Sequence, residues 1–274
     1  MTPRPIYKPE HVRSPAYHLR YTWSGWPSSS RFPQLPSDDF FGELDRKWQT
    51  EGLRRLEMKW TPSLIQMTFS VKPPISPVFF ASRVKGRLQH ALRNAGLQSK
   101  FSRKVGFRTI GENRTSIVNA YINRQVDREK FVDDRFAGFM KQFTVTDPTI
   151  ELDEPTETNS GRYWYNLHLV LVVNQRTRFV DNQSLRTIER GCVRIASKRG
   201  YAIASRSVMP DHLHLALRGN IEHSPQEMAL AFMNNLAYVM RQNAIWQLGY
   251  YVGTFGVYDM GAVRTVGTDR LSSS

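Results

Sequence analysis

Hydrophobic and polar residues alternate along several short stretches of the chain, and such alternation predicts strands. The clearest stretch is VMPDHLHLAL at 208–217, where leucines alternate with histidine and alanine. Residues two apart in a strand point to the same face of the sheet. This strand is therefore predicted to bury its leucines and to present His212 and His214 side by side on the other face.

The predicted elements follow the same order in both halves of the chain. Each half has an opening strand, a helix, a strand pair, a helix that begins with Ser-Pro, and a further strand, because proline and serine favour the first turn and the cap of a helix. The opening strand is predicted at 17–25 and 163–173, and the first helix at 39–55 and 181–199. The strand pair ends at 64–71 and 211–218, and the Ser-Pro helix spans 76–95 and 224–243. The further strand lies at 104–110 and 249–256. The first half then continues into a long predicted helix at 114–142, whereas the second half ends almost at once.

Identical residues recur at nearly constant spacing between the halves, which indicates a duplicated domain. Tyr17 matches Tyr165 at an offset of 148. The same offset relates Ser76, Pro77, Ala81, Leu88 and Arg93 to Ser224, Pro225, Ala229, Leu236 and Arg241. An offset of 145 relates Thr109, Gly111 and Val118 to Thr254, Gly256 and Val263. We predict an α+β fold in which each copy is an antiparallel sheet with helices.

Composition divides the chain into four parts. We expect a basic, proline-containing N-terminal arm at 1–16 and a first domain at 17–146. Residues 147–161 carry five acidic and no basic residues, with two prolines, and are predicted to be a linker. The second domain is predicted at 162–274.

The net charge of +14, from 38 Lys and Arg against 24 Asp and Glu, favours a polyanionic partner. We expect nucleic acid rather than an anionic membrane. Residues 83–108 carry eight basic and no acidic residues and are expected to hold phosphates, with Phe101 and Phe107 among them to stack on bases. The DNA-binding candidates in this run are Arg83, Lys85, Arg87, Arg93, Lys100, Arg103, Lys104 and Arg108. The alternative is a solvated basic helix face with phenylalanines in the core.

Targeting signals are not evident in the sequence. No apolar stretch reaches transmembrane length, and the first residues lack the apolar segment of a signal peptide. Cys192 is the one cysteine, so no disulfide can form within the chain. We expect a cytoplasmic, nucleoid-associated bacterial protein that does not bind a membrane.

The string VMPDHLHLALRGN, together with YNLHLVLVVNQRTRF and KRGYAIASRSVMPDHLHLAL, resembles the HUH-type single-strand tyrosine transposases of insertion sequences. This IS200-like group includes the REP-associated tyrosine transposases. The resemblance covers nearly all of 163–265. It implies ferredoxin-like HUH domains, a tyrosine nucleophile on a late helix, and a glutamine four residues after that tyrosine. On spacing alone, a His-x-His pair is equally compatible with two partly exposed strand histidines.

The two copies differ in which part of this pattern they keep. The second copy has His212 and His214 but places Val266 where the resemblance implies a tyrosine. The first copy has Tyr121 and Gln125, four residues apart and hence on one helical face. Aligned at an offset of 146, its residues opposite the histidines are Gln66 and Thr68, which form a poor metal site.

We therefore expect one composite site, in which Tyr121 and Gln125 of the first copy meet His212 and His214 of the second across a pseudo-twofold axis. The chain is then a fused dimer, a monomer that acts as an internal pseudo-dimer. The alternative is that both copies decayed independently and the protein only binds single-stranded or hairpin DNA. RNA binding is a third possibility, because basic charge does not distinguish the two nucleic acids.

The resemblance implies cleavage and transfer of single-stranded DNA, with hairpins as the usual substrate. A cation held by His212, His214 and the Gln125 amide oxygen is expected to polarise the scissile phosphate while Tyr121 attacks it, leaving a 5′-phosphotyrosine and a free 3′-hydroxyl. Mg2+ or Mn2+ suits mixed nitrogen and oxygen ligands, although imidazoles also accept zinc or nickel. Asp211 either orients an imidazole or is a turn residue. With one tyrosine, nicking or single-strand transfer is easier than full transposition.

Overall fold

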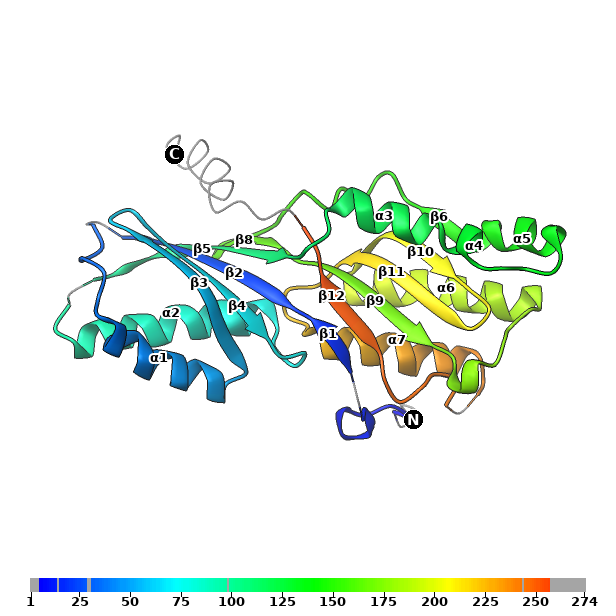
Figure 1. Ribbon diagram of the computed structural model, residues 1–274, viewed down its shortest axis with the longest axis horizontal. Helices are drawn as coiled ribbons and strands as arrows, with labels where there is room; N and C mark the ends of the chain where they lie inside the picture. Colours follow the sequence, from blue (N-terminus) through cyan, green and yellow to red (C-terminus); the bar gives the residue numbers. More distant parts are fainter. Residues whose placement is uncertain (1–4, 14, 29–30, 98, 243, 257–274) are drawn as a thin grey trace.

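Two six-stranded sheets lie end to end in this computed structural model, which describes residues 5–13, 15–28, 31–97, 99–242 and 244–256 (Figure 1). Helices pack against both sheets, so the predicted α+β class is confirmed. Within the described residues, no helix has the length and apolar character needed to cross a membrane.

The first sheet, on the left in Figure 1, has the strand order β3-β4-β2-β5-β8-β7. Its strands are β2 (Arg20–Pro27), β3 (Leu53–Thr61), β4 (Leu64–Val71), β5 (Phe101–Ile110), β7 (Thr156–Thr158) and β8 (Gly161–Trp164). Helices α1 (Asp38–Thr50) and α2 (Pro77–Asn94) cover one face. Alternation along the strands places Tyr21, Phe69 and Phe107 against Phe80 of α2, where their rings meet edge to face.

The second sheet has the order β1-β12-β9-β11-β10-β6. Its strands are β1 (Ala16–His18), β6 (Thr144–Thr146), β9 (Asn166–Val172), β10 (Ala202–Val208), β11 (His212–Arg218) and β12 (Tyr251–Thr254). Helices α6 (Asn182–Arg199) and α7 (Pro225–Val239) cover the face that carries the leucines of β11. Helix α3 (Thr115–Asn123) lies on the opposite face, and α4 (Gln125–Arg128) and α5 (Asp134–Met140) continue from it (Figure 1).

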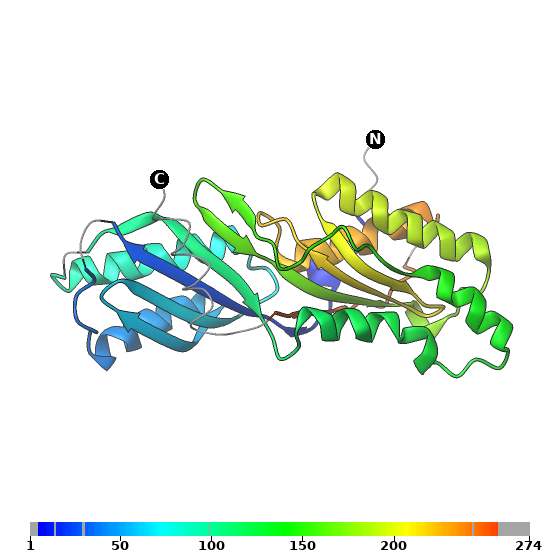
Figure 2. The ribbon, with the colours of Figure 1, turned by 90° about the horizontal axis from the view of Figure 1, so that it is seen from above.

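Strands at the join pass from one sheet into the other (Figure 2). The chain runs from β1 in the second sheet into β2 in the first, and from β8 in the first sheet into β9 in the second. β1 pairs with β12, and β8 with β5, in parallel orientation. Each sheet is therefore mixed, although its other strand pairs are antiparallel as predicted. The parallel partners β1 and β8 are each followed directly by a strand of the other sheet.

Hydrogen bonds across the join occur in reciprocal pairs. Val78 N–H donates to the Ile221 carbonyl, and Gln226 N–H donates to the Pro73 carbonyl. Donors and acceptors exchange halves and keep the offset of 148 found in the sequence. This reciprocity is the contact pattern that a two-fold interface produces.

The hydroxyls of Thr109 and Thr254 repeat this reciprocity where the long strands cross. Each hydroxyl accepts from an N–H at the start of a crossing strand, Thr109 from Asn166 and Thr254 from Arg20. Thr109 Oγ1 donates to the Trp164 carbonyl at 3.1 Å, whereas Thr254 Oγ1 donates to the Ile110 carbonyl at 2.6 Å, with the His18 carbonyl farther away at 3.3 Å. Two threonines 145 residues apart thus make corresponding contacts at the two crossing points.

The same comparison fixes which residues of β4 and β11 are equivalent. Val71 N–H donates to the Leu19 carbonyl, and Gly219 N–H donates to the Tyr165 carbonyl. Val71 and Gly219 are 148 apart, and no register shift interrupts the pairing of β4 with β2 or of β11 with β9. The bulges in the neighbouring pairs lie on β3 and β10. The acceptors Leu19 and Tyr165 are 146 apart, so the match of Tyr17 with Tyr165 at 148 was wrong. The equivalence therefore extends along the whole of both strands.

Leu64 and Gln66, rather than Gln66 and Thr68, therefore occupy the places of His212 and His214. The offset of 146 used in the sequence alignment was too small by two residues, one full period of the strand. A register shift of two residues leaves every side chain on the same face of the sheet. The alternation of hydrophobic and polar residues therefore cannot detect an alignment error of this size. An apolar leucine now stands opposite His212, and this makes the first copy a still poorer metal site.

The Ser-Pro helices begin as predicted. Ser76 Oγ accepts from Phe79 N–H at the start of α2, and Pro77 is the first helical residue. At the start of α7, Ser224 Oγ accepts from Glu227 N–H while the Glu227 carboxylate accepts from Ser224 N–H, a complete capping box.

Several local predictions differ from the structure. The helix predicted at 39–55 ends at Thr50, and β3 begins at Leu53. The helix predicted at 114–142 is broken into α3, α4 and α5, because Arg124 leaves helical geometry and Asp133 caps a new helix. The acidic linker at 147–161 contains β7, and its Leu152 is buried. Within the N-terminal arm Tyr7 is buried, and its hydroxyl accepts from Trp246 N–H. Residues beyond 256, including Val263 and Val266, lie outside the described residues.

Candidate active site

Helix α3 brings the first copy onto the sheet of the second copy. Ser205 Oγ on β10 donates to Asn119 Oδ1 at 3.0 Å, and Thr146 Oγ1 on β6 donates to Asn123 Oδ1 at 2.9 Å. A small apolar cluster, separate from the main core, completes the contact through Val118, Ile122, Leu152, Ala204, Ala216 and Phe255. The helix is thus held by both polar and apolar contacts over the face that carries the histidines.

Tyr121, on α3, lies directly against the histidines. Its ring centroid is 5.6 Å from that of His214 and 5.8 Å from that of His168, and both contacts are edge to face. The structure therefore brings together the tyrosine of the first copy and the His-x-His strand of the second, as the composite-site hypothesis requires.

His212 and His214 both project from β11 onto this face, and their rings are 4.9 Å apart. Asp211 Oδ1 accepts a hydrogen bond from His212 Nδ1 at 2.6 Å, and Arg176 donates to the other carboxylate oxygen at 3.0 Å. Burial raises the pKa of the Asp211 carboxyl, but the hydrogen bonds from His212 and Arg176 outweigh burial and place the pKa below its usual value. Asp211 therefore remains a carboxylate that fixes the His212 ring.

His168, on β9, was not among the predicted site residues. Its Nε2 is 3.0 Å from His214 Nδ1, and the two rings stack at 5.3 Å with an interplanar angle of 20°. The alternation in NLHLVLV already placed one histidine on the polar face of an otherwise apolar strand. The sequence did not show that β9 pairs with β11, and this pairing sets the two rings side by side.

Burial keeps both stacked rings neutral. It lowers the pKa of His168 to about 4, and it lowers that of His214, with His168 and His212 adding to the effect, to about 2. Neutral imidazole is the form that coordinates a metal ion, because a protonated ring has no free lone pair.

The donor set fits a divalent cation only in part. The hydrogen bonds of His212 and His214 both use Nδ1, so Nε2 is the ligating atom each ring offers. Among the described residues, no group of three or more His, Cys, Asp and Glu is arranged to hold a metal ion. Further ligands must therefore come from an amide, the substrate or water.

Gln125 was predicted as the third ligand, and the structure places it one helical turn after Tyr121. Its side-chain amide is buried, and Nε2 donates to the Tyr121 carbonyl at 3.1 Å. The amide oxygen remains a suitable hard donor, although the described contacts do not join it to either histidine. Arg128 completes this side of the site, with its guanidinium 4.7 Å from the centre of the Tyr121 ring.

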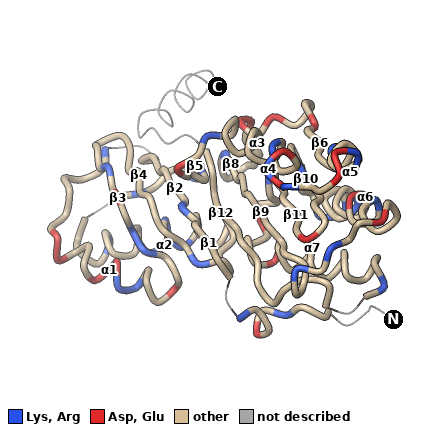
Figure 3. The backbone as a smooth tube through the Cα atoms, turned by 45° about the vertical axis from the view of Figure 1, so that its right-hand side comes forward, with Lys and Arg blue, Asp and Glu red and all other residues tan. Residues whose placement is uncertain are grey.

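Basic residues are spread over both halves rather than gathered on one element (Figure 3). The run at 83–108 lies on α2 and β5 of the first sheet. Four of its eight basic residues are exposed to solvent and take no part in the ion pairs described below, namely Arg93, Lys100, Arg103 and Lys104. These four remain candidates for DNA binding.

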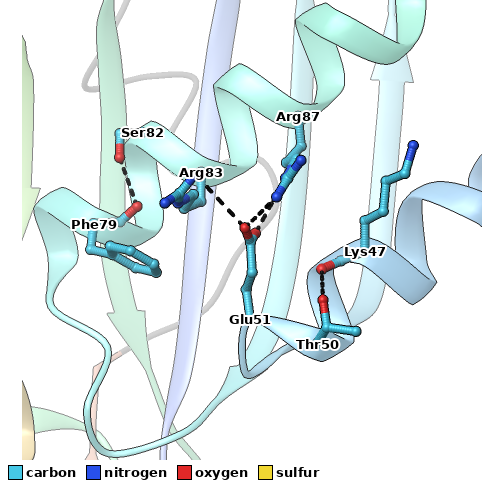
Figure 4. Close-up of polar contacts among 7 residues, drawn as sticks. All are labelled: Lys47, Thr50, Glu51, Phe79, Ser82, Arg83 and Arg87. Carbon is cyan, nitrogen blue, oxygen red and sulfur yellow. Dashed lines mark hydrogen bonds and ion pairs between the residues drawn. The ribbon is translucent and has the colours of Figure 1, made fainter.

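The other four residues of the run are engaged within the protein. Arg83 and Arg87 both pair with Glu51 (Figure 4). Lys85 donates to the Ser102 carbonyl at 2.6 Å, and Arg108 lies over the Trp164 ring at 5.1 Å. Burial lowers the pKa of both Lys85 and Arg108.

Phe101 and Phe107 belong to the core, so the idea that they stack on bases was wrong. Phe101 contacts Trp23, and Phe107 contacts Tyr21 and Tyr163. Alternation along β5 turns both rings towards the helix-covered face, where aromatic burial is favourable. The alternative reading of this run, core phenylalanines within a basic segment, is the correct one for these two residues.

Comparison with protein families matches residues 162–265 to the family described as "Transposase IS200 like". This match covers less than half of the chain, and it confirms the resemblance expected from the sequence for that segment. A search of curated proteins gives no match.

Two solved structures are similar to part of the chain. One is a candidate transposase from Deinococcus radiodurans, 18% identical, covering 37% of this chain and 85% of its own, with a TM-score of 0.31. The other is a REP-associated tyrosine transposase bound to a REP hairpin, 12% identical, covering 37% of this chain and 61% of its own, with a TM-score of 0.30. At these TM-scores neither structure supports an inference about this chain.

Proposed function

We propose that this chain, which contains an IS200-like transposase region at 162–265, cleaves and transfers single-stranded DNA at one composite active site. The observation that carries the proposal is the contact between Tyr121 of the first copy and His214 of the second. The chain acts as a fused dimer in which the strand exchange at the join aligns the two contributions.

Each side chain has a defined task in this reaction. Tyr121 Oη attacks the scissile phosphorus, forming a phosphotyrosine bond as the bond from phosphorus to the 3′-oxygen breaks. The phenolic proton is lost to solvent, and the departing 3′-oxygen takes up a proton to become a hydroxyl. The phosphodiester energy is conserved in the new bond, so rejoining needs no ATP.

His212, His214 and the Gln125 amide oxygen would hold a divalent cation, Mg2+ or Mn2+, with the remaining positions filled by substrate and water. When bound, the cation polarises the phosphate and stabilises the charge that develops on it. Asp211 fixes the His212 ring, and Arg128 beside Tyr121 offers the phosphate a cationic neighbour.

Hairpin DNA is the proposed substrate, on the basis of the family resemblance and the charge of +14. Arg93, Lys100, Arg103 and Lys104 are the exposed residues of the basic run available to contact phosphates. The competing proposal is a hairpin-binding protein without catalysis. The first copy has Leu64 and Gln66 in place of the histidine pair, so a protein whose second copy was also inactive would only bind DNA.

A covalent-adduct assay separates these proposals. Protein, Mn2+ and end-labelled hairpin DNA with single-stranded flanks are incubated and run on a denaturing gel. We expect a labelled adduct with the wild type. Tyr121→Phe and His214→Ala should each reduce adduct formation by on the order of 1000-fold or more. Neither change should weaken DNA binding much. Tyr238→Phe, at an exposed tyrosine on α7, is the matched control and keeps the adduct. Hairpin binding with no adduct under any metal would favour the binding protein.

A further inference from the structure

The geometry points to His168 as a positioning residue that accepts a hydrogen bond from His214 Nδ1–H and so directs His214 Nε2 to the proposed cation. This inference rests on the proposed function. It assigns a role to the imidazole of β9, which the His-x-His motif does not include.

A neutral imidazole carries a single N–H, and the nitrogen without the proton is the ligand. His214 can coordinate through Nε2 only if its proton sits on Nδ1. The atom 3.0 Å from Nδ1 is His168 Nε2, so His168 must supply the lone pair that this proton needs. Both histidines of β11 then donate from Nδ1 and leave Nε2 free, because Asp211 accepts from Nδ1 of His212.

The surroundings of His168 hold its ring in one orientation. Its imidazole stacks on His214, and the rings of Tyr121 and Tyr251 contact it edge to face at 5.8 Å and 5.7 Å. β9 pairs with both β11 and β12, so the backbone of His168 lies in the middle of the sheet. A ring fixed in this way is a preorganised acceptor, as outer partners of metal-bound histidines are.

His168 does not itself serve as a third ligand in this arrangement, because its Nε2 is occupied by His214. The difference between acceptor and ligand can be measured. An acceptor can be replaced by glutamine, whose amide oxygen reaches about as far as imidazole Nε2. A nonpolar side chain such as leucine fills similar space but accepts nothing.

The test measures Mn2+ binding by the full chain, without DNA, in wild type, His168→Leu and His168→Gln. Outer partners of this kind typically contribute about 10- to 100-fold in affinity. We expect His168→Leu to bind Mn2+ about 10- to 100-fold more weakly and His168→Gln to stay within about threefold of wild type. His214→Ala gives the reference for a lost ligand, and His90→Leu, at an exposed histidine of α2, is the matched control.

A second readout needs neither metal nor activity. Nitrogen-15 NMR of the metal-free protein reports which nitrogen of His214 is protonated. We expect Nδ1–H in the wild type and His168→Gln, and a shift to Nε2–H in His168→Leu. Circular dichroism confirms that each variant is folded.

Three results would overturn the role of His168. They are a wild-type His214 protonated on Nε2, unchanged Mn2+ affinity in His168→Leu, and three coordinated imidazoles in the pulsed EPR spectrum of the wild type. Absence of a Tyr121 adduct alongside the expected Mn2+ and NMR results would instead refute the strand-transfer function and leave the positioning role in place.

Discussion

His168 and His214 show how a single pairing of side chains can prepare a site for chemistry. Both rings are held neutral by burial, and each has the other as its hydrogen-bond partner. Burying an ionisable group in its neutral form has a cost that depends on pH, since the unfolded chain remains free to take up protons.

This cost predicts a specific acid sensitivity. As the pH falls below 6.5, the unfolded chain protonates both histidines, whereas the folded chain does not protonate His168 until about pH 4. Each buried histidine then removes about 1.4 kcal/mol from the free energy of unfolding per pH unit. We expect urea unfolding between pH 6.5 and 4.5 to show a shallower pH dependence in His168→Leu than in wild type. His90→Leu should keep the wild-type slope, and equal slopes in all three proteins would contradict the prediction.

At the scale of elements, helix α3 is the part of the first copy that reaches the histidines. It is part of the first copy in the sequence, but it packs on the sheet of the second copy. Its contact with the sheet includes two side-chain hydrogen bonds and a small apolar cluster, both outside the main core. The position of Tyr121 therefore depends on a contact that can be weakened without disturbing either core.

We predict that Asn119→Ala loosens α3 selectively. Removing the bond from Ser205 should cost about 1 kcal/mol, which makes local opening of the helix about fivefold more frequent. Hydrogen exchange of the α3 amides should accelerate by this factor, while the amides of α7 exchange as before. Asn182→Ala, at the exposed start of α6, is the control. Uniform acceleration in α3 and α7 would show that the contact belongs to the global fold instead.

At the scale of the whole molecule, neither copy is complete alone. The second sheet takes β1, β6 and α3 from residues before 147, and the first sheet takes β7 and β8 from residues after 155. Reciprocal bonds between α2, α7 and the loops before them close the same join. The predicted division into domains at 17–146 and 162–274 thus describes the sequence repeat, whereas the sheets are built from both parts.

Separated halves should therefore fail to fold. Residues 162–274 alone would expose the edges of β10 and β12 and the apolar surface that α3 covers. We expect this fragment to give a poorly dispersed NMR spectrum and to regain dispersion when co-expressed with residues 1–161. The full chain provides the reference spectrum, and a native-like spectrum from the isolated fragment would refute the prediction.

Local features were determined by the sequence because they depend on neighbours along the chain. Alternation placed β4, β9 and β11, and Ser-Pro with its following residues placed α2 and α7. The repeat and the His-x-His string were visible without coordinates, and they led to Tyr121 together with His212 and His214. The expected proximity of these residues rested on the family resemblance and not on any periodicity.

Tertiary structure decided everything that depends on which segments meet. Strand exchange at the join places Tyr121 on the sheet of the other copy, and the pairing of β9 with β11 gives His214 its partner His168. Glu51, outside the basic run, forms ion pairs with Arg83 and Arg87 within it. Periodicity reports the face on which a side chain lies, whereas its partner is set by long-range packing, for which this chain carries no local signal.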